Sequence, residues 1–248
     1  MNPLLLKIDH LTGGYSRSRP VLHDISLDVH EGEVVGLIGL NGAGKSTTIK
    51  HVLGMLEPIS GSIELKGQTF LDAKETYRQH YVYIPETPTL YDQLTLAEHL
   101  QLTAMAYGID KKTYEQRLPD LLKEFRMENK LKWFPGHFSK GMRQKVMIMC
   151  AFLVQPSLYI VDEPFIGLDP IGIQSFLDLM LEMKGSGAGV LMSTHILSTA
   201  EQYCDRFVIL HDGRIKMKGT ISELRKQIGL PGASLHEIYI LATKGDES

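Results

Sequence analysis

One glycine-rich stretch constrains the fold of this chain more than any other feature of its sequence. The stretch GLNGAGKS, residues 39–46, matches the pattern G-x-x-x-x-G-K-[ST] in full. It follows EVVGLIG, a short and continuously apolar stretch of the kind that forms central parallel strands. The residues after Lys45 have helical character. A strand, this loop and a helix in that order predict an α/β protein with a P-loop NTPase core.

The residue types in the loop suit the binding of nucleotide phosphates. Gly42 and Gly44 allow backbone N–H groups to turn toward the β- and γ-phosphates, where Lys45 adds a positive charge. The Ser46 hydroxyl can ligate Mg²⁺, and the dipole of the following helix favours an anion. A glycine-rich turn that merely connects strand to helix is the alternative, but the Lys-Ser pair would then have no purpose. We expect contacts with ATP from Gly39, Leu40, Asn41, Gly42, Ala43, Gly44, Lys45, Ser46 and Thr47.

A second apolar stretch, LYIVDEP, ends in two carboxylates. Asp162, at the end of a buried strand, is expected to serve the Mg²⁺ ion of a P-loop NTPase. Glu163 should point the opposite way, because side chains alternate along a strand. It could then hold the attacking water and act as a general base. The alternative is an ordinary acidic strand end, and the presence of the phosphate loop argues against it.

Composition limits the class of protein and its partners. With 248 residues, 43% of them hydrophobic and 22% charged, the chain is long enough to bury a large core. The formal net charge of −3 gives no basis for a nucleic-acid partner, and none is expected. Two cysteines, Cys150 and Cys204, are too few for a disulfide framework and favour a reducing compartment. No apolar run reaches the roughly 20 residues of a membrane span, and the start of the chain lacks a signal-peptide pattern.

The order of the predicted elements divides one domain, residues 1–248, into lobes. Strand candidates occur in residues 1–87 and again in residues 157–220, which together form an α/β nucleotide-binding lobe. Residues 88–156 are predicted to be an inserted helical subdomain, because LTLAEHLQLTAMAYG and KKTYEQRLPDLLKEFRM have helical spacing. Residues 221–248 are predicted to form a C-terminal helical tail.

Taken together, these segments resemble the ATP-binding subunits of ABC transporters over most of the chain. FSKGM, residues 138–142, is the counterpart of that family's Leu-Ser-Gly-Gly-Gln signature, and it precedes the Walker B strand at residues 158–163 in the family's order. GLD, residues 167–169, resembles the D-loop. His195 in MSTH matches the switch histidine, and Tyr15 in TGGY matches the aromatic residue that stacks on adenine. The alternatives are a structural histidine and a plain turn tyrosine.

The resemblance implies a fold, an activity and a membrane partner. The fold is an ABC ATPase core with an antiparallel β subdomain and an inserted α-helical subdomain. The activity is Mg²⁺-dependent hydrolysis of ATP to ADP and phosphate, with Lys45, Glu163 and His195 as catalytic residues. Stretches such as YIPETPTLYDQLT and HFSKGMRQKVMIMCAF are similar to Ecs-type ATP-binding proteins, which implies export. The chain would then be peripheral, on the cytoplasmic face of the membrane, held by an integral subunit of the EcsB type.

The resemblance also implies a dimer of two copies packed head to tail. In such a dimer, the signature of one chain closes on the γ-phosphate that the phosphate loop of the other chain holds. Ser139 can cap the signature helix, and Gly141 lets a backbone or a ligand come close. The residues implied to contact the nucleotide of the second copy are Ser139, Lys140, Gly141, Met142 and Asp169.

Three positions depart from the family's pattern. Lys140 replaces the first glycine of the signature, and Met142 replaces its glutamine. Lys140 could add charge near the γ-phosphate, or it could stay solvated as exposed lysines commonly do. Glu86 in YIPE stands where many relatives carry a glutamine, and it is expected to meet Mg²⁺ or water. Its negative charge beside Asp162 and Glu163 could slow hydrolysis or change its pH dependence.

Other nucleotide-binding classes fit the sequence less well. A GTPase would need Asn-Lys-x-Asp, and the nearest string, NKLK at residues 129–132, lacks the aspartate. An ABC protein of the DNA-repair kind would need a long coiled coil, and the sequence has no heptad run of that length. A translation-factor ABC protein would carry two cassettes on one chain. A nucleotide-gated binding module without enzyme activity would lose the base, and Glu163 is present.

The stretch IPETPTLYDQLT, residues 84–95, is predicted to form the wall of a groove that receives a short helix of the membrane subunit. Its prolines limit the backbone conformation, so that a shift at Glu86 could be passed along the segment. Leu90 and Tyr91 could present apolar surface to a partner helix. The alternative is a surface loop whose leucine and tyrosine fold back onto the protein's own core.

Overall fold

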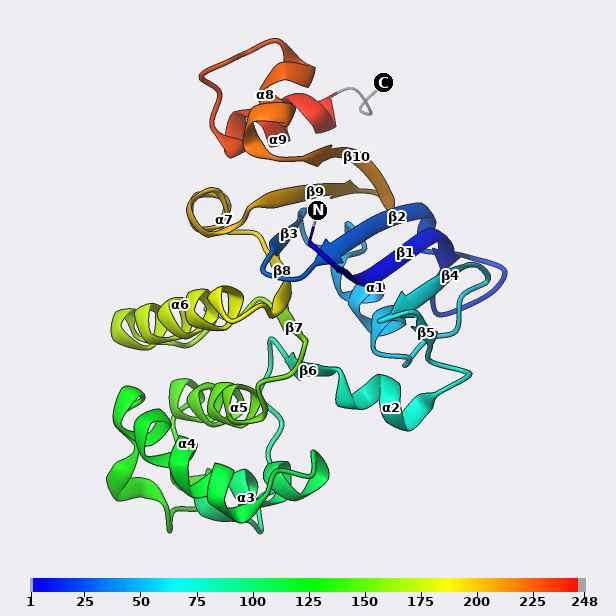
Figure 1. The fold of residues 1–248 in the computed structure, drawn as a ribbon. Helices are drawn as coiled ribbons and strands as arrows, with labels where there is room; N and C mark the ends of the chain where they lie inside the picture. The colour runs from blue at the N-terminus through cyan, green and yellow to red at the C-terminus, as the bar shows by residue number, and fades with distance from the viewer. Residues whose placement is uncertain (1, 245–248) are drawn as a thin grey trace.

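The computed structural model describes residues 2–244, so residues 245–248 of the predicted tail lie outside the described part. An antiparallel sheet with strand order β2-β1-β4-β5 lies beside the parallel sheet in Figure 1. It consists of β1 (Leu4–Gly13), β2 (Leu22–His30), β4 (Ser60–Leu65) and β5 (Gln68–Thr69). This sheet corresponds to the antiparallel subdomain that the family resemblance implies.

The other sheet has the strand order β10-β9-β3-β8-β7-β6 and is parallel except at its β10–β9 edge. It consists of β3 (Val34–Ile38), β6 (Tyr81–Ile84), β7 (Leu158–Asp162), β8 (Gly189–Thr194), β9 (Arg206–His211) and β10 (Arg214–Gly219). Every residue of β3, β7 and β8 is buried. Continuous apolar stretches such as EVVGLIG therefore form central strands with both faces covered, as the sequence predicts.

The register of the central strands decides where the chemically active residues meet. β8 pairs with β3 on one side and with β7 on the other, so that Ile38 lies opposite Thr194 and Asp162 lies opposite Ser193. The carboxyl ends of parallel strands share one edge of the sheet, where ligands of open α/β sheets usually bind. The segments that follow β3, β7 and β8 therefore emerge side by side.

Helices form the lobe between β6 and β7 and also cover the parallel sheet (Figure 1). The inserted lobe contains α3 (Leu96–Ala106), α4 (Lys111–Glu124) and α5 (Lys140–Val154). α5 is capped as the sequence predicts, because the N–H of Met142 donates to Ser139 Oγ at 3.2 Å. The other helices are α1 (Lys45–Val52), α2 (Lys74–Gln79), α6 (Pro170–Gly185), α7 (Leu197–Tyr203), α8 (Ile221–Ile228) and α9 (Leu235–Thr243), and 3₁₀ turns lie at Glu128–Lys130 and Pro135–His137.

Two short elements, β5 and α2, are not predicted by the sequence. β5 has 2 residues and α2 has 6, so neither is long enough to show a hydrophobic period. Tyr77 is the buried residue of α2, and its hydroxyl donates to the Val52 carbonyl at 2.8 Å. Tertiary contact rather than local pattern therefore holds this helix.

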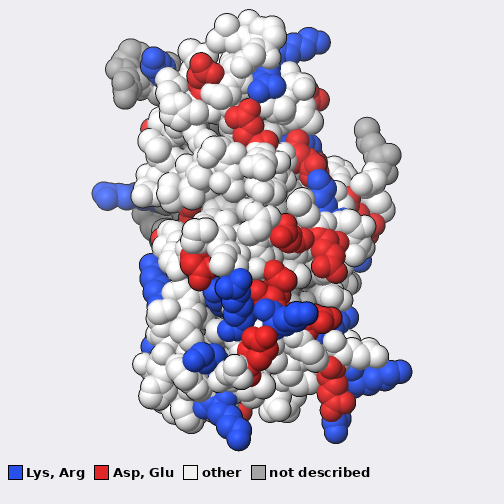
Figure 2. Space-filling view, turned by 90° about the vertical axis from the view of Figure 1, so that its left-hand side faces the viewer, with Lys and Arg blue, Asp and Glu red and all other residues white. Residues whose placement is uncertain are grey.

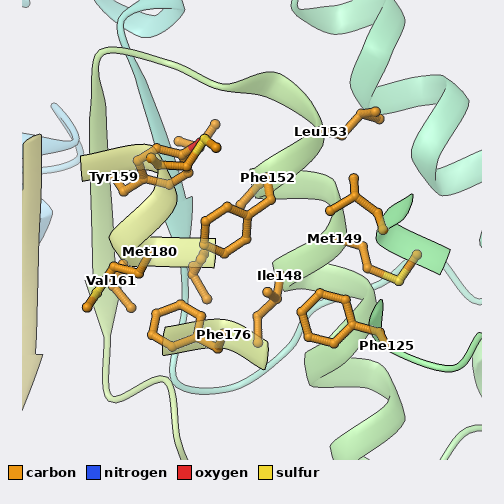
Figure 3. Packing of buried hydrophobic residues seen from close by; sticks show 14 of the residues in the cluster. Phe125, Ile148, Met149, Phe152, Leu153, Tyr159, Val161, Phe176 and Met180 are labelled. Atoms are coloured by element: carbon orange, nitrogen blue, oxygen red, sulfur yellow. The ribbon is translucent and has the colours of Figure 1, made fainter. Parts of the chain in front are cut away.

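Aromatic side chains join the helical lobe to the sheet (Figure 3). Phe152 of α5 stacks on Tyr159 of β7 with ring centroids 5.1 Å apart, and it meets Phe176 of α6 edge to face at 5.9 Å. All three side chains are buried. Ile148 of α5 and Val161 of β7 belong to the same cluster. Because Val161 directly precedes Asp162, this cluster fixes the strand that carries the carboxylates.

No helix among residues 2–244 is both long and apolar enough to cross a membrane. Acidic and basic side chains are interspersed on the face shown in Figure 2, and much of the middle of that face is uncharged.

Both cysteines are free thiols. Burial raises the pKa of Cys150 to about 11 and that of Cys204 to about 12.

Replacing Phe176 by alanine should lower the free energy of unfolding by about 3–5 kcal/mol, because it leaves a cavity between α5, α6 and β7. Leu181 lies on the same helix with 39% of its surface exposed, so Leu181→Ala should lower this free energy by only about 1 kcal/mol. Urea unfolding followed by circular dichroism measures both. Equal effects of the two substitutions would contradict the assignment of Phe176 to the core.

Candidate nucleotide-binding site

A cleft of about 380 Å³ lies at the carboxyl edge of the parallel sheet. This volume falls within the usual range for small-molecule sites, about 300–1,000 Å³. Its walls come from the phosphate loop, the segments after β6, β7 and β8, and the turn after β1. The lining residues are Tyr15, Val21, Leu40, Asn41, Gly42, Gly44, Lys45, Ser46, Thr47, Glu86, Glu163, Ile166 and His195.

The phosphate loop has the backbone that an anion site needs. Gly42 and Gly44 have φ angles of 86° and 110°, a region that side-chain-bearing residues rarely adopt. Gly44 stands at the N-cap of α1 and has no side chain to accept the N–H groups of the first helical turn. Those groups are therefore available to phosphate oxygens. Gly39 and Ala43, which the sequence also predicts as ligand contacts, do not line the cleft.

Lys45 is buried within the loop that it follows, with 6% of its surface exposed. Its Nζ donates to the carbonyl of Gly39 at 2.8 Å and to that of Leu40 at 3.3 Å. The same ammonium lies 3.6 Å from Oε1 of Glu163. A buried charge needs partners of this kind to be tolerated. The carboxylate and the carbonyls hold the ammonium at the cleft, where a phosphate could contact it.

Glu163 reaches the cleft for a different reason from the one that the sequence suggests. β7 ends at Asp162, and Glu163 is not part of the strand, so strand alternation does not set its direction. Its φ is 47°, the left-handed region, and its N–H donates to the Ser193 carbonyl at 3.1 Å. This turn separates the two carboxylates and carries Glu163 toward Lys45. The prediction that strand alternation points Glu163 away from Asp162 is therefore wrong. A turn after the strand separates the two side chains instead.

The carboxylate of Glu163 links the ammonium to the histidine. Oε2 lies 2.8 Å from Nδ1 of His195 and accepts the backbone N–H of His195 at 3.3 Å. Oε1 is buried and has no hydrogen-bond partner among residues 2–244. A buried carboxylate oxygen without a donor can accept a hydrogen bond from a ligand or a water. The three residues that the resemblance implies to be catalytic are thus in contact.

Asp162 lies behind the cleft and does not line it. It is buried, with 4% of its surface exposed, and it accepts a hydrogen bond from the Ser193 hydroxyl. Tyr83 of β6 is a close neighbour, since burial and the nearby carboxylates of Asp162 and Glu86 raise the pKa of its hydroxyl. Both carboxylates are therefore near the Tyr83 hydroxyl, and of the two only Glu86 lines the cleft.

The oxygen donors in and behind the cleft fit Mg²⁺ better than a softer metal. Ser46 and Glu86 line the cleft, and Asp162 stands behind it. Mg²⁺ in nucleotide sites is usually held by one or two carboxylates together with phosphate oxygens and water. Residues 2–244 contain no group of three or more His, Cys, Asp or Glu side chains that could hold a metal ion. In a nucleotide site of this kind, phosphate oxygens and water would complete the coordination of Mg²⁺.

Tyr15 lies at the mouth of the cleft, with 62% of its surface exposed. Its hydroxyl accepts a hydrogen bond from Lys50 Nζ at 3.0 Å, and the same ammonium lies 5.1 Å from the ring centroid. The hydrogen bond from Lys50, followed by one from Thr47, lowers the pKa of Tyr15. The ring is therefore anchored by α1 while remaining accessible to a planar ligand.

The signature residues are not part of this cleft. Ser139, Lys140, Gly141, Met142 and Asp169 do not line it. Gly141 packs directly against the carbonyl of Gly167, so its lack of a side chain permits a backbone contact. Asp169 caps α6 through the N–H of Gly172 at 2.6 Å and pairs with Lys145 at 3.0 Å, and these two contacts lower its pKa. Within one chain, the signature and the phosphate loop form separate sites.

Val21 and Ile166 line the cleft although the sequence does not predict them. Val21 precedes β2, and its N–H donates to the Gly13 carbonyl at 2.8 Å, which closes the loop that carries Tyr15. Ile166 follows the Walker B segment by a few residues. A single apolar residue in a loop carries no pattern, so no sequence signal could have identified either one.

Comparisons with known proteins show which family this chain is similar to. The family model described as ABC transporter matches residues 22–166. The chain is 62% identical to the ABC-type transporter ATP-binding protein EcsA of Bacillus subtilis (strain 168), over 98% of this chain and 98% of the relative. A solved structure of the ATP-binding subunit of an ABC transporter is 59% identical, with a TM-score of 0.94, over 96% of this chain and 99% of that one.

The chain belongs to the ABC transporter ATP-binding protein family. It is an ATP-binding subunit of an ABC transporter and an ATPase. The sequence-based prediction that the chain resembles this family, and most of all its Ecs type, is confirmed. The predicted fold class, an α/β ABC ATPase core with an antiparallel subdomain and a helical insertion, is also confirmed.

Proposed function

We propose that this chain binds Mg-ATP in the cleft and hydrolyses it as part of a head-to-tail dimer docked on a membrane subunit. The observation that carries the proposal is the connected set of Lys45, Glu163 and His195 beside the phosphate loop, with contacts of 3.6 Å and 2.8 Å. Phosphoryl transfer to water needs positive charge at the phosphates and a group that orients the attacking water. Lys45 and Glu163 would supply these, and His195 contacts the Glu163 carboxylate.

Each residue of the set has a distinct task in this proposal. The ammonium of Lys45 holds the β- and γ-phosphates. The Glu163 carboxylate takes the proton of the water that attacks the γ-phosphorus, as the bond to the leaving ADP oxygen breaks. His195 fixes the direction of that carboxylate through its contact of 2.8 Å and lies where it could sense the γ-phosphate. Bound Mg²⁺, held by Ser46 and Glu86 with Asp162 behind them, would neutralise phosphate charge.

Two substitutions should separate binding from hydrolysis. Lys45→Ala should abolish measurable ATP binding, because it removes the charge that acts on bound phosphate. Glu163→Gln should keep ATP binding while turnover falls by roughly 10²–10⁴-fold, the usual effect of losing a positioned general base. Equilibrium binding of a fluorescent ATP analogue and steady-state phosphate release measure the two effects.

Lys111→Ala serves as the control for loss of a lysine, because the Lys111 side chain is 88% exposed on α4. It should change neither measurement. Turnover of Glu163→Gln within about twofold of wild type would be too high for a lost general base. The chain would then act as a nucleotide-gated module or use another base.

The position of the signature supports a dimer in which two chains complete each other's sites. Ser139 and Lys140 are exposed at the start of α5, and neither lines the cleft of its own chain. Close packing of Gly141 on Gly167 joins the signature to the D-loop in one continuous edge. A second copy related by a two-fold axis would bring this edge to the γ-phosphate in both sites at once.

Mixing two inactive variants should restore activity if the signature acts in trans. One variant is Lys45→Ala and the other is Ser139→Asp, which keeps the helix cap but places a carboxylate near the partner's γ-phosphate. The heterodimer has one site with both lesions and one with neither. An equal mixture should therefore recover up to about a quarter of wild-type phosphate release, since half of the dimers carry one intact site of two.

Ser139→Asn is the matched control, because asparagine caps a helix as well as aspartate but adds no charge. It should be less inhibited than Ser139→Asp. Differently tagged chains show whether heterodimers form. If they form and activity stays at the level of the separate variants, the head-to-tail arrangement is wrong.

The segment at residues 84–95 is proposed to contact the membrane subunit. Glu86 lines the nucleotide cleft, whereas Tyr91, a few residues later, has 63% of its surface exposed and stacks on His99 of α3. Leu90 instead packs against the protein's own core. The predicted groove wall therefore fits Tyr91, and the alternative of a loop folded onto the core fits Leu90.

Trp133 is also exposed, and its carbonyl accepts the N–H of Leu96 at the start of α3. Exposed aromatic residues of this kind are enriched at interface centres.

We further propose that the partner is an integral membrane subunit of the EcsB type and that transport is outward. The Ecs-type likeness, which extends over 98% of the chain, supports both proposals. The subunit would hold this chain at the cytoplasmic face of the membrane.

Tyr91→Asp should prevent co-purification with the membrane subunit while ATP binding and thermal stability stay at wild-type levels. The reason is that a charge at the centre of an apolar contact lacks a partner there. Leu71→Asp, at a residue 64% exposed on the antiparallel lobe, is the control and should assemble normally. Normal assembly of Tyr91→Asp, or a markedly lower unfolding temperature, would exclude Tyr91 as the docking residue.

A further inference from the structure

The C-terminal helices α8 and α9 lie outside residues 22–166, the part that the family model matches, yet α9 contacts the phosphate loop. The backbone N–H of Leu40 donates to the hydroxyl of Tyr239 in α9 at 3.3 Å. Tyr239 is buried, with 8% of its surface exposed. A side chain from the tail therefore holds a main-chain group of the loop that binds ATP.

The strand that leads into the loop is held by the same helices. Ile38, the last residue of β3, is fully buried in a cluster with Leu235, Ile238 and Tyr239 of α9. Ile38 precedes the loop and Leu40 is its second residue, so the tail contacts both sides of Gly39. The tail thereby fixes the direction in which the chain leaves the sheet.

Other polar main-chain groups in this part of the loop already have partners, and the Leu40 amide has Tyr239. The Leu40 carbonyl already accepts the N–H of Ala43 at 3.1 Å and Lys45 Nζ at 3.3 Å. The Ala43 carbonyl accepts the N–H of Gly213 in the β9–β10 turn at 3.0 Å. A part-buried N–H without an acceptor is unfavourable. Tyr239 thus completes a set of hydrogen bonds that holds this part of the loop in its conformation.

The tail is itself rigidly attached, so it can act as a support. Thr220 with Glu223, and Ser234 with Glu237, form capping boxes at the starts of α8 and α9. The Glu201 carboxylate of α7 accepts hydrogen bonds from Arg225 of α8 at 3.0 Å and from the Leu235 N–H of α9 at 2.8 Å. Since α7 begins two residues after His195, the tail is anchored to both the loop and the helix that follows the histidine.

We infer that Tyr239 is a positioning residue for ATP binding, and this inference rests on the assignment of ATP to the cleft. Its hydroxyl keeps the first turn of the phosphate loop in the conformation that receives the phosphates. Without that acceptor the loop populates other conformations, and the apparent Kd for ATP rises by the inverse of the competent fraction. The bond joins Leu40 to Tyr239 and involves none of Lys45, Glu163 and His195, so kcat at saturating ATP should stay unchanged.

Tyr239→Phe in the full-length chain tests this directly, because it removes only the hydroxyl oxygen. The Kd for ATP should rise about two- to tenfold, the effect of one lost hydrogen bond. The KM should rise in parallel, with kcat within about twofold of wild type. Amide hydrogen exchange in the peptide that contains Leu40 should be faster in the variant.

Tyr107→Phe is the matched control, since the Tyr107 hydroxyl also bonds a main-chain group, the Tyr81 carbonyl at 3.0 Å, but far from the loop. It should leave the Kd and the exchange of the Leu40 peptide unchanged. Unchanged values in Tyr239→Phe, or an equal loss in Tyr107→Phe, would overturn the role of Tyr239 alone. Failure of wild type to bind ATP would overturn the assignment of the cleft as well.

Discussion

The parallel pairing of β8 with both β3 and β7 is the constraint on which the rest of the molecule depends. It places the ends of these three strands along one edge, with Ile38 opposite Thr194 and Asp162 opposite Ser193. The phosphate loop, the carboxylate and the histidine follow those ends directly. A slip of one residue would reverse every side chain of the slipped strand. Because the central strands are buried on both faces, such a slip would also displace the core.

The site contains charges and a backbone conformation that an ordinary core would not tolerate. Lys45 and Glu163 are each 6% exposed, and isolated buried charges of this kind are strongly unfavourable. Their mutual contact and the loop carbonyls offset part of that cost. The left-handed φ of Glu163 costs about 1–3 kcal/mol in a non-glycine residue. The packed strands on either side, together with the bond from Glu163 to Ser193, hold the residue there.

How much could be predicted depended on how local each feature is in the chain. The phosphate loop, the central strands and the helical insertion follow from patterns within short windows of sequence. The place of Glu163 after an apolar strand predicts a carboxylate at the cleft, and the structure places it there, but its direction comes from a turn that alternation could not reveal. Val21 and Ile166 belong to no pattern. The contact of Leu40 with Tyr239 joins residues 199 positions apart, and neither residue type suggests the other.

This separation in sequence has a consequence for the synthesis of the protein. β3 and its loop emerge from the ribosome well before α9, which follows them in the chain. Domains fold as units during synthesis, at about 5–20 residues per second. The growing chain therefore carries its phosphate loop for about 10–40 seconds before the Tyr239 acceptor for the Leu40 amide exists. A chain cut short before α9 would keep every nucleotide-binding motif and still lack the acceptor. The motifs are therefore translated before the site that contains them is complete.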